Sequence, residues 1–267
     1  MRMVKRTEDR MEVLFGFFGT LVSFILLITA ALFSPGYNPL IDAVSDLGKE
    51  EAKTLFSISF VVGGSLSIPF FIFLERELIN IKESIRRLAT GISIFTCVCI
   101  ALVGIIPDET FWDIFQVFHG VVAVVSFVGS SIYIVLYSIL MYNGPKSKMY
   151  KGPTFKKYHA YFGFSNGVVL IILAIMLIMT NPFTPFIEWI LTILMYLWIL
   201  ITAIELISYK FFNIPGVYYR RTQYPEALKL FEDALQILNN LNLSNEPITQ
   251  TLNENIEFLK KQLEKEN

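Results

Sequence analysis

Long apolar stretches with few charges alternate with short polar connections over most of the chain. Six of these stretches are long enough to cross a hydrocarbon layer, which takes about 20 helical residues. They cover residues 13–33, 55–74, 88–106, 114–142, 161–180 and 187–209. The pattern predicts an all-α fold, a polytopic bundle of six transmembrane helices within a first domain of residues 1–212.

The pattern changes after residue 212, where the composition becomes that of soluble helices. Apolar residues recur at steps of four and three along two segments, one after Pro225 and one after Pro247. Proline is favoured at the first position of a helix. Residues 213–267 are therefore predicted to form a second domain, a small cytoplasmic helical hairpin.

The composition excludes an ordinary soluble protein. Apolar residues make up 54% of the 267 residues and charged residues 17%, against about 25% charged residues in soluble domains. The net charge of −1 argues against nucleic acid as a partner. The sequence contains no Walker A, GxGxxG or HExxH motif and no CxxC pair, so no cofactor is expected.

Basic residues are distributed unequally between the two sides of the predicted bundle. Two of them, Lys49 and Lys53, lie in the connections on one side, whereas thirteen lie on the side of the N-terminus. The thirteen are Arg2, Lys5, Arg6, Arg10, Arg76, Lys82, Arg86, Arg87, Lys146, Lys148, Lys151, Lys156 and Lys157. Because basic flanks stay on the cytoplasmic side, we predict a multi-pass protein of the cell membrane with both termini in the cytoplasm.

The first outer connection, residues 34–54, carries the most individual motif of the chain. The motif consists of Tyr37, Asn38 and Pro39, followed by Ser45, Asp46, Leu47 and Gly48. It resembles the six-span membrane family catalogued as domain of unknown function 998, and the resemblance covers residues 10–212. The resemblance implies six spans but no established chemistry. The Ser-Asp-x-Gly element is also distantly similar to the Frag1/DRAM/Sfk1 group, some members of which are associated with lipid handling.

A small and polar stripe follows one face of the fourth predicted span. It begins at His119 and continues with Ala123, Ser126, Ser130, Tyr133 and Tyr137 at steps of four and three. Lipid cannot satisfy these polar groups, so the stripe is expected to face protein. His119 would then lie near Asp108 and Asp113 and near Ser45 and Asp46.

Two interpretations of this outer cluster are open. Ser45, Asp46, Asp108 and His119 are candidate catalytic residues, since a serine, a histidine and a carboxylate can act as nucleophile, base and orienting group. Asp46, Asp108 and His119 are also candidate metal ligands. The alternative is structural: Ser45 and Asp46 cap or brace the start of the second span, and His119 hydrogen-bonds to them.

Two further polar residues lie inside predicted spans. They are Asn166 in the fifth and Glu205 near the end of the sixth, and the sequence gives neither an evident partner. Polar groups at such depth are candidates for a solute path. They are the basis of a transporter hypothesis.

The tail offers a possible interaction surface. Ala227, Phe231 and Ala234 are spaced as in the second helix of a tetratricopeptide repeat, which the tail resembles in part. A single hairpin must bury its apolar faces against itself, the membrane surface, another copy or a partner. Residues 222–267 are therefore a candidate for self-association or for binding a protein partner.

Together these features predict a non-catalytic membrane protein that binds membrane lipids or a partner. The alternatives are a membrane-embedded lipid hydrolase or transferase that uses the outer cluster, and a small transporter.

Overall fold

The computed structural model describes residues 2–106, 113–144, 150, 152–212, 224–240 and 247–264, and every regular element in these ranges is a helix. The chain forms two compact units, Met1–Phe211 and Phe212–Asn267. The predicted all-α class is confirmed.

The first unit contains six long helices, and each predicted span falls largely within one of them. They are α1 (Arg2–Leu32), α2 (Lys53–Glu77), α3 (Glu83–Ile105), α4 (Asp113–Asn143), α5 (Lys157–Ile178) and α6 (Thr184–Ile207). Two short helices accompany them, η1 (Val44–Gly48) and η3 (Ser208–Phe212). We call the end of the bundle that carries η1 the outer end, and the end where α3 and α5 begin the inner end.

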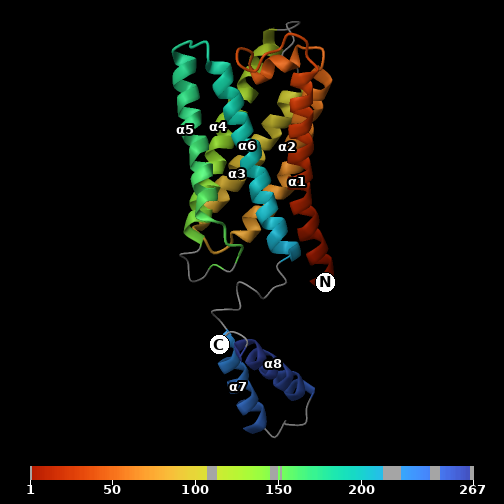
Figure 1. Cartoon of the computed structure of the whole chain (residues 1–267), viewed down its shortest axis with the longest axis vertical. Coiled ribbons are helices and arrows are strands. Elements are labelled where there is room, and N and C mark those ends of the chain that lie inside the picture. Colours follow the sequence, from red (N-terminus) through yellow and green to blue (C-terminus); the bar gives the residue numbers. More distant parts are fainter. Residues whose placement is uncertain are drawn as a thin grey trace. The chain divides into compact units, whose positions relative to one another are not determined.

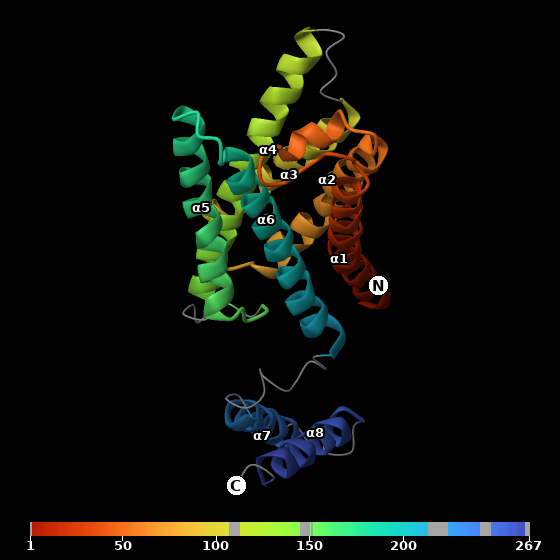
Figure 2. The ribbon, with the colours of Figure 1, turned by 45° about the horizontal axis from the view of Figure 1, so that its top comes forward.

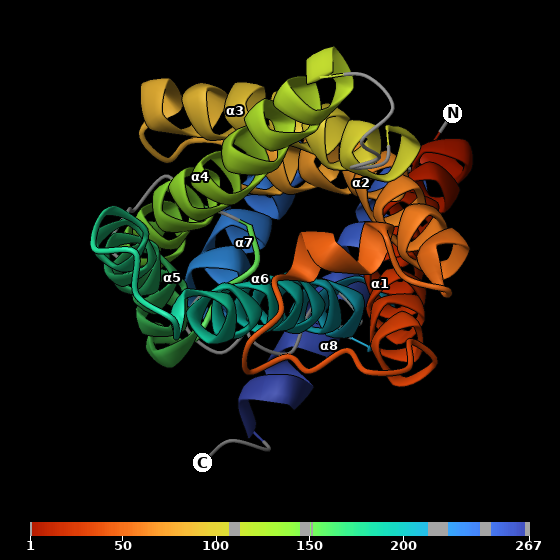
Figure 3. The ribbon, with the colours of Figure 1, turned by 90° about the horizontal axis from the view of Figure 1, so that it is seen from above.

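The six helices form a closed ring. Each helix packs against the next one in the sequence, and α6 packs against α1 to close the circle (Figures 1 and 3). Helix α4 also contacts α6. Helix α5 is the least buried span: 17% of an 18-residue apolar stretch is buried, against 33–44% of the corresponding stretches of the other helices.

Large apolar side chains cover the outside of the ring. Phe18 is 53% exposed on α1, Phe95 is 63% exposed on α3 and Ile171 is 62% exposed on α5. Contiguous apolar surface on this scale is not tolerated in water. All six helices are long and apolar enough to cross a membrane, so the first unit is a polytopic integral membrane bundle.

Helix α4 is longer than a bilayer requires. Its 31 residues extend about 46 Å at 1.5 Å per residue, against a hydrocarbon thickness of about 30 Å. The helix slants across the bundle, and its outer end stands apart from its neighbours (Figures 2 and 3). The tilt expected from its length is therefore present. Helix α2 continues as one helix through Pro69.

Glycines allow the closest helix contacts. A Cβ atom at Gly64 would lie 2.5 Å from the backbone oxygen of Cys97, so α2 and α3 approach each other through backbone. At Gly163 of α5, a Cβ would overlap Ser138 Oγ of α4 and lie 2.7 Å from Trp198 Nε1 of α6. Gly64 and Gly163 thus serve packing within the chain.

The second unit is a pair of helices, α7 (Tyr224–Asn240) and α8 (Pro247–Glu264), which pack against each other. Helix α8 begins at the predicted proline. Thr249 and Ile256 are buried between the helices, and Lys260 Nζ of α8 lies 2.9 Å from Glu232 Oε1 of α7. The likeness to a tetratricopeptide repeat stays a prediction.

Candidate functional site

The outer motif is fastened to α6 through Tyr37. Its hydroxyl donates a hydrogen bond to the backbone oxygen of Ala43 (2.8 Å) and accepts one from Trp189 Nε1 of α6 (2.8 Å). The rings of Tyr37 and Trp189 meet edge to face with centroids 6.2 Å apart. Burial raises the pKa of the Tyr37 hydroxyl above its usual range, which keeps the proton that it donates.

The polar residues of the motif satisfy the backbone of their own loop. Asp46 Oδ2 accepts the N–H of Ala43 (2.8 Å), as in the second half of a capping box. Asn38 Oδ1 accepts the N–H of Leu40 (3.1 Å), and Asp42 Oδ2 accepts the N–H of Asn38 (2.7 Å). The first contact caps η1 and the other two stabilise the turn that precedes it, so Asp46 caps η1 rather than the start of α2.

The apolar residues of the motif close the outer end of the bundle. Leu47 is fully buried in a cluster with Leu27, Phe56 and Trp189. A Cβ at Gly48 would lie 3.3 Å from the Phe56 ring, so a larger residue there is disfavoured. The Ser-Asp-Leu-Gly element therefore covers the outer ends of the helices and packs against their buried side chains.

Glu188 of α6 completes this connection and was not anticipated from the sequence. Its Oε1 accepts the N–H of Val44 at the start of η1 (3.1 Å). The neighbouring residues Glu188 and Trp189 thus bind the loop through a carboxylate and an indole. A carboxylate next to an aromatic residue at the outer end of the last span was the available sequence signal.

The predicted stripe on α4 faces protein, as expected. His119, Ser126, Ser130, Tyr133 and Tyr137 are all at most 7% exposed. His119 Nδ1 lies 2.7 Å from the backbone oxygen of Ile106. A carbonyl only accepts, so Nδ1 carries the proton and donates it. The other nitrogen, Nε2, is buried and has no hydrogen-bond partner in the described part of the chain.

The structure does not join the four predicted catalytic residues. Ser45 and Asp46 lie together in η1, but His119 hydrogen-bonds to Ile106 rather than to either of them. Asp108 lies outside the described residues. Among the residues described, no group of three or more His, Cys, Asp and Glu side chains is placed to hold a metal ion. The catalytic role of Ser45, Asp46, Asp108 and His119 and the metal role of Asp46, Asp108 and His119 stay predictions.

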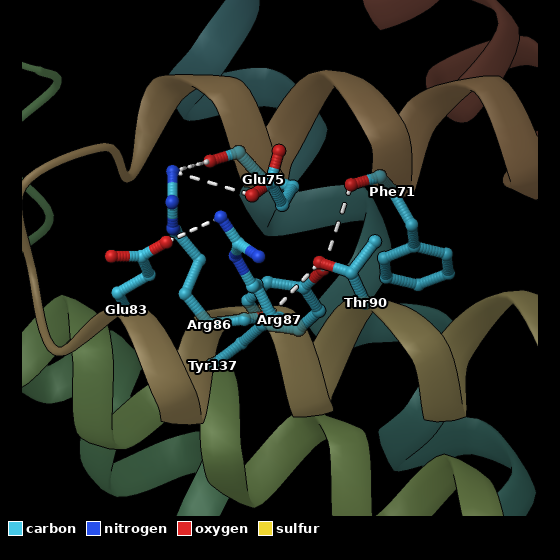
Figure 4. Close-up of polar contacts among 7 residues, drawn as sticks. All are labelled: Phe71, Glu75, Glu83, Arg86, Arg87, Thr90 and Tyr137. Atoms are coloured by element: carbon cyan, nitrogen blue, oxygen red, sulfur yellow. Dashed lines mark hydrogen bonds and ion pairs between the residues drawn. The ribbon is translucent and has the colours of Figure 1, made fainter.

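A buried arginine connects three helices at the inner end (Figure 4). The side chain of Arg86 on α3 is 8% exposed, and its Nη1 lies 3.3 Å from Glu75 Oε1 on α2. Thr90 Oγ1 donates to the backbone oxygen of Arg86 (3.0 Å). The Thr90 hydroxyl has only this one hydrogen to donate. Its oxygen, 3.0 Å from the Tyr137 hydroxyl oxygen of α4, therefore accepts a hydrogen bond from the tyrosine.

Other ion pairs surround this inner end. Arg76 of α2 pairs with Glu12 of α1, and Lys210 Nζ of η3 lies 2.7 Å from Glu77 Oε1 of α2. Basic residues that determined the predicted orientation thus also bind neighbouring helices together.

Glu205 has a partner that the sequence did not reveal. Its Oε2 lies 2.7 Å from Nδ1 of His159 at the start of α5. Asn166 is fully buried, donates from Nδ2 to the backbone oxygen of Phe162 (3.3 Å), and leaves Oδ1 without a partner in the described residues. Neither residue has an evident partner in the sequence, and the structure supplies His159 for Glu205 and the Phe162 backbone oxygen for Asn166. The placement of His159 and Glu205 at the same inner end was the only sequence signal.

A groove of about 600 Å³ runs between α3 and α4 on the outside of the bundle. Its walls are apolar side chains and two glycines, with one charged residue, Arg87. Its lining includes Arg87, Gly91, Phe95, Thr96, Val124 and Val128. Arg87 is exposed and pairs with Glu83 one turn earlier in α3 (Figure 4).

Comparison with known proteins identifies the family. Residues 17–205 match the family model described as "Protein of unknown function (DUF998)". Searches of curated proteins and of solved structures give no significant match. The matched range covers more than half of the chain, including the outer motif and nearly all of the six-helix bundle. The chain therefore belongs to the DUF998 family of proteins of unknown function.

Proposed function

We propose that the protein is a non-catalytic membrane protein that binds an anionic phospholipid, with one acyl chain in the groove between α3 and α4. The apolar groove itself carries this proposal. Its volume of about 600 Å³ is within the range of about 300–1,000 Å³ that is typical of ligand sites.

The length of the groove suits one leaflet. From Arg87 to Thr96 the α3 wall rises about 13.5 Å at 1.5 Å per residue. Half of a hydrocarbon layer of about 30 Å is about 15 Å. An acyl chain from the leaflet at the inner end can therefore lie along the whole groove while its headgroup stays level with Arg87.

The headgroup preference follows from Arg87. Its guanidinium is 73% exposed and its partner Glu83 is 63% exposed, and such surface pairs contribute only about 0–1 kcal/mol. A lipid phosphate can replace this carboxylate and accept two parallel hydrogen bonds from the guanidinium. Phosphatidylcholine has the same phosphate, but its positively charged choline is repelled by the guanidinium, so the site should prefer the net negative phosphatidylglycerol.

Gly91→Leu tests the groove. No atom lies within 4 Å of a Cβ added at Gly91, so the leucine enters the groove without disturbing helix contacts. If it displaces about ten carbon contacts of about 0.1–0.2 kcal/mol each, phosphatidylglycerol binding falls about tenfold in native mass spectrometry. Gly120→Leu is the matched control, because Gly120 is also on a lipid-exposed helix face with no atom within 4 Å.

Arg87→Gln tests the headgroup. It should abolish the preference for phosphatidylglycerol and leave phosphatidylcholine binding unchanged, whereas Glu83→Gln should strengthen the preference. Equal lipid binding by the wild type and Gly91→Leu would refute the groove as the site.

We also propose that the protein resides in the cell membrane with its inner end in the cytoplasm, on the basis of the excess of basic residues there. Single cysteines can be introduced by Lys49→Cys at the outer end and Lys82→Cys at the inner end. The native Cys97 and Cys99 are buried. In intact cells, a membrane-impermeant maleimide should label Lys49→Cys alone, and labelling of Lys82→Cys alone would reverse the orientation.

A further inference from the structure

His159 is fully buried at the start of α5 and uses both ring nitrogens. Nε2 lies 3.0 Å from Thr202 Oγ1, and Nδ1 lies 2.7 Å from Glu205 Oε2, both on α6. The Thr202 hydroxyl donates its single hydrogen to the backbone oxygen of Trp198 (2.7 Å). The hydroxyl oxygen can only accept from the ring, so Nε2 must carry a proton.

The Nδ1 contact then requires a second proton. A neutral ring protonated at Nε2 has a lone pair on Nδ1, and this lone pair would face the lone pairs of the Glu205 carboxylate at 2.7 Å. Two acceptors repel at this distance, whereas 2.7–2.9 Å is typical of an N⁺–H···O⁻ hydrogen bond. With both nitrogens protonated, each N–H of His159 has an acceptor.

The surroundings also favour the cation. The His159 ring lies between the Trp198 ring, with centroids 5.6 Å apart, and the Phe155 ring, with centroids 5.9 Å apart. Aromatic rings within about 6 Å attract a cation through their quadrupoles. The Glu205 side chain is 21% exposed and lies two residues from the inner end of α6.

Other titratable or charged groups lie around the pair on every neighbouring element. Glu205 on α6 is the charged side chain in direct contact with His159. On α4, Tyr137 lies beyond Trp198 and Tyr142 stacks near Tyr161 of α5. Lys156 and Lys157 are exposed at the start of α5. Lys210 is paired with Glu77.

We propose that His159 and Glu205 form a proton-binding site that holds α5 against α6. A proton from the aqueous phase at the inner end adds to the Nδ1 lone pair and yields an imidazolium paired with a carboxylate. Release of the same proton restores the lone pair opposite the carboxylate and weakens the contact. Helix α5 is the least buried span, so its attachment depends more on such a contact than that of the other helices.

Nitrogen-15 NMR of histidine-labelled protein in lipid nanodiscs tests the site directly. The chain has two histidines, and His119→Gln assigns their signals. At pH 7, His159 should show two protonated ring nitrogens, and it should lose the Nδ1 proton as the pH rises. A neutral His159 ring at pH 7 would overturn the proposal.

Glu205→Gln removes the carboxylate charge and keeps a side chain of the same size, so it distinguishes an effect of the proton from an effect of packing. The amide can donate to a neutral Nδ1, so His159 should appear as the neutral Nε2–H form at pH 7. Hydrogen exchange of α5 backbone amides is read as a protection factor, corrected for the intrinsic rise of amide exchange with pH. This factor should fall as the pH rises in the wild type and stay constant in Glu205→Gln. Glu51→Gln, which removes an exposed carboxylate at the outer end, is the control and should keep the wild-type pH dependence. The same pH dependence of α5 exchange in Glu205→Gln and the wild type would also refute the role of the proton.

Discussion

Gly163→Ala should destabilise the bundle by steric overlap among α4, α5 and α6. The added Cβ would overlap Ser138 Oγ and lie 2.7 Å from Trp198 Nε1. Overpacking of this kind costs about 1–3 kcal/mol, while replacing glycine by alanine in a helix gains about 0.5–1 kcal/mol. The expected net loss is about 1–2 kcal/mol, which corresponds to a decrease of several degrees in the apparent Tm in mild detergent at about 2–4 °C per kcal/mol.

Two further variants make this prediction specific. Gly91→Ala also replaces a helical glycine but has no atom within 4 Å of the added Cβ, so it should raise the apparent Tm slightly. Adding Ser138→Gly to Gly163→Ala removes the overlapping hydroxyl and should recover more than the loss caused by Ser138→Gly alone. An apparent Tm of Gly163→Ala at or above that of Gly91→Ala would refute the close packing.

Three other predictions follow from the contacts. Tyr37→Phe leaves the indole N–H of Trp189 without its acceptor and removes one of the two hydrogen bonds to the Ala43 oxygen, which keeps the Asp46 N–H. It should cost about 1–3 kcal/mol in thermal unfolding. Arg86→Met leaves Glu75 without its ion pair and should lower the apparent Tm. Arg87→Gln should change the free energy of unfolding by less than about 0.5 kcal/mol and therefore leave the apparent Tm nearly unchanged, since its ion pair is exposed. Deletion of residues 222–267 should reduce the oligomer size measured by light scattering or release a bound protein partner; no change in either would exclude the tail as an interaction surface.

The sequence determined the spans because each apolar stretch is stable as a helix in lipid without contacts to the other helices. A helix in hydrocarbon satisfies its own backbone, so length and apolarity are enough to predict where α1–α6 lie. The polar stripe on α4 was predictable for the same reason: the step of three or four residues places His119 and Tyr137 on one face, and lipid excludes that face. Asp46 as a local cap also follows from neighbouring residues, although the sequence interpretation assigned its cap to α2 rather than η1.

The partners of the polar groups were decided by the tertiary structure. Tyr37 and Trp189 are 152 positions apart, and His159 and Glu205 are 46 apart. Hydropathy specifies which side chains turn away from lipid, but not which distant helix supplies the hydrogen-bond acceptor. That choice depends on the order and rotation of the helices around the ring, which arise from the packing at positions such as Gly64 and from the closure of α6 against α1. The groove along α3 and α4 likewise exists only once the two helices lie side by side, because neither helix encloses it alone.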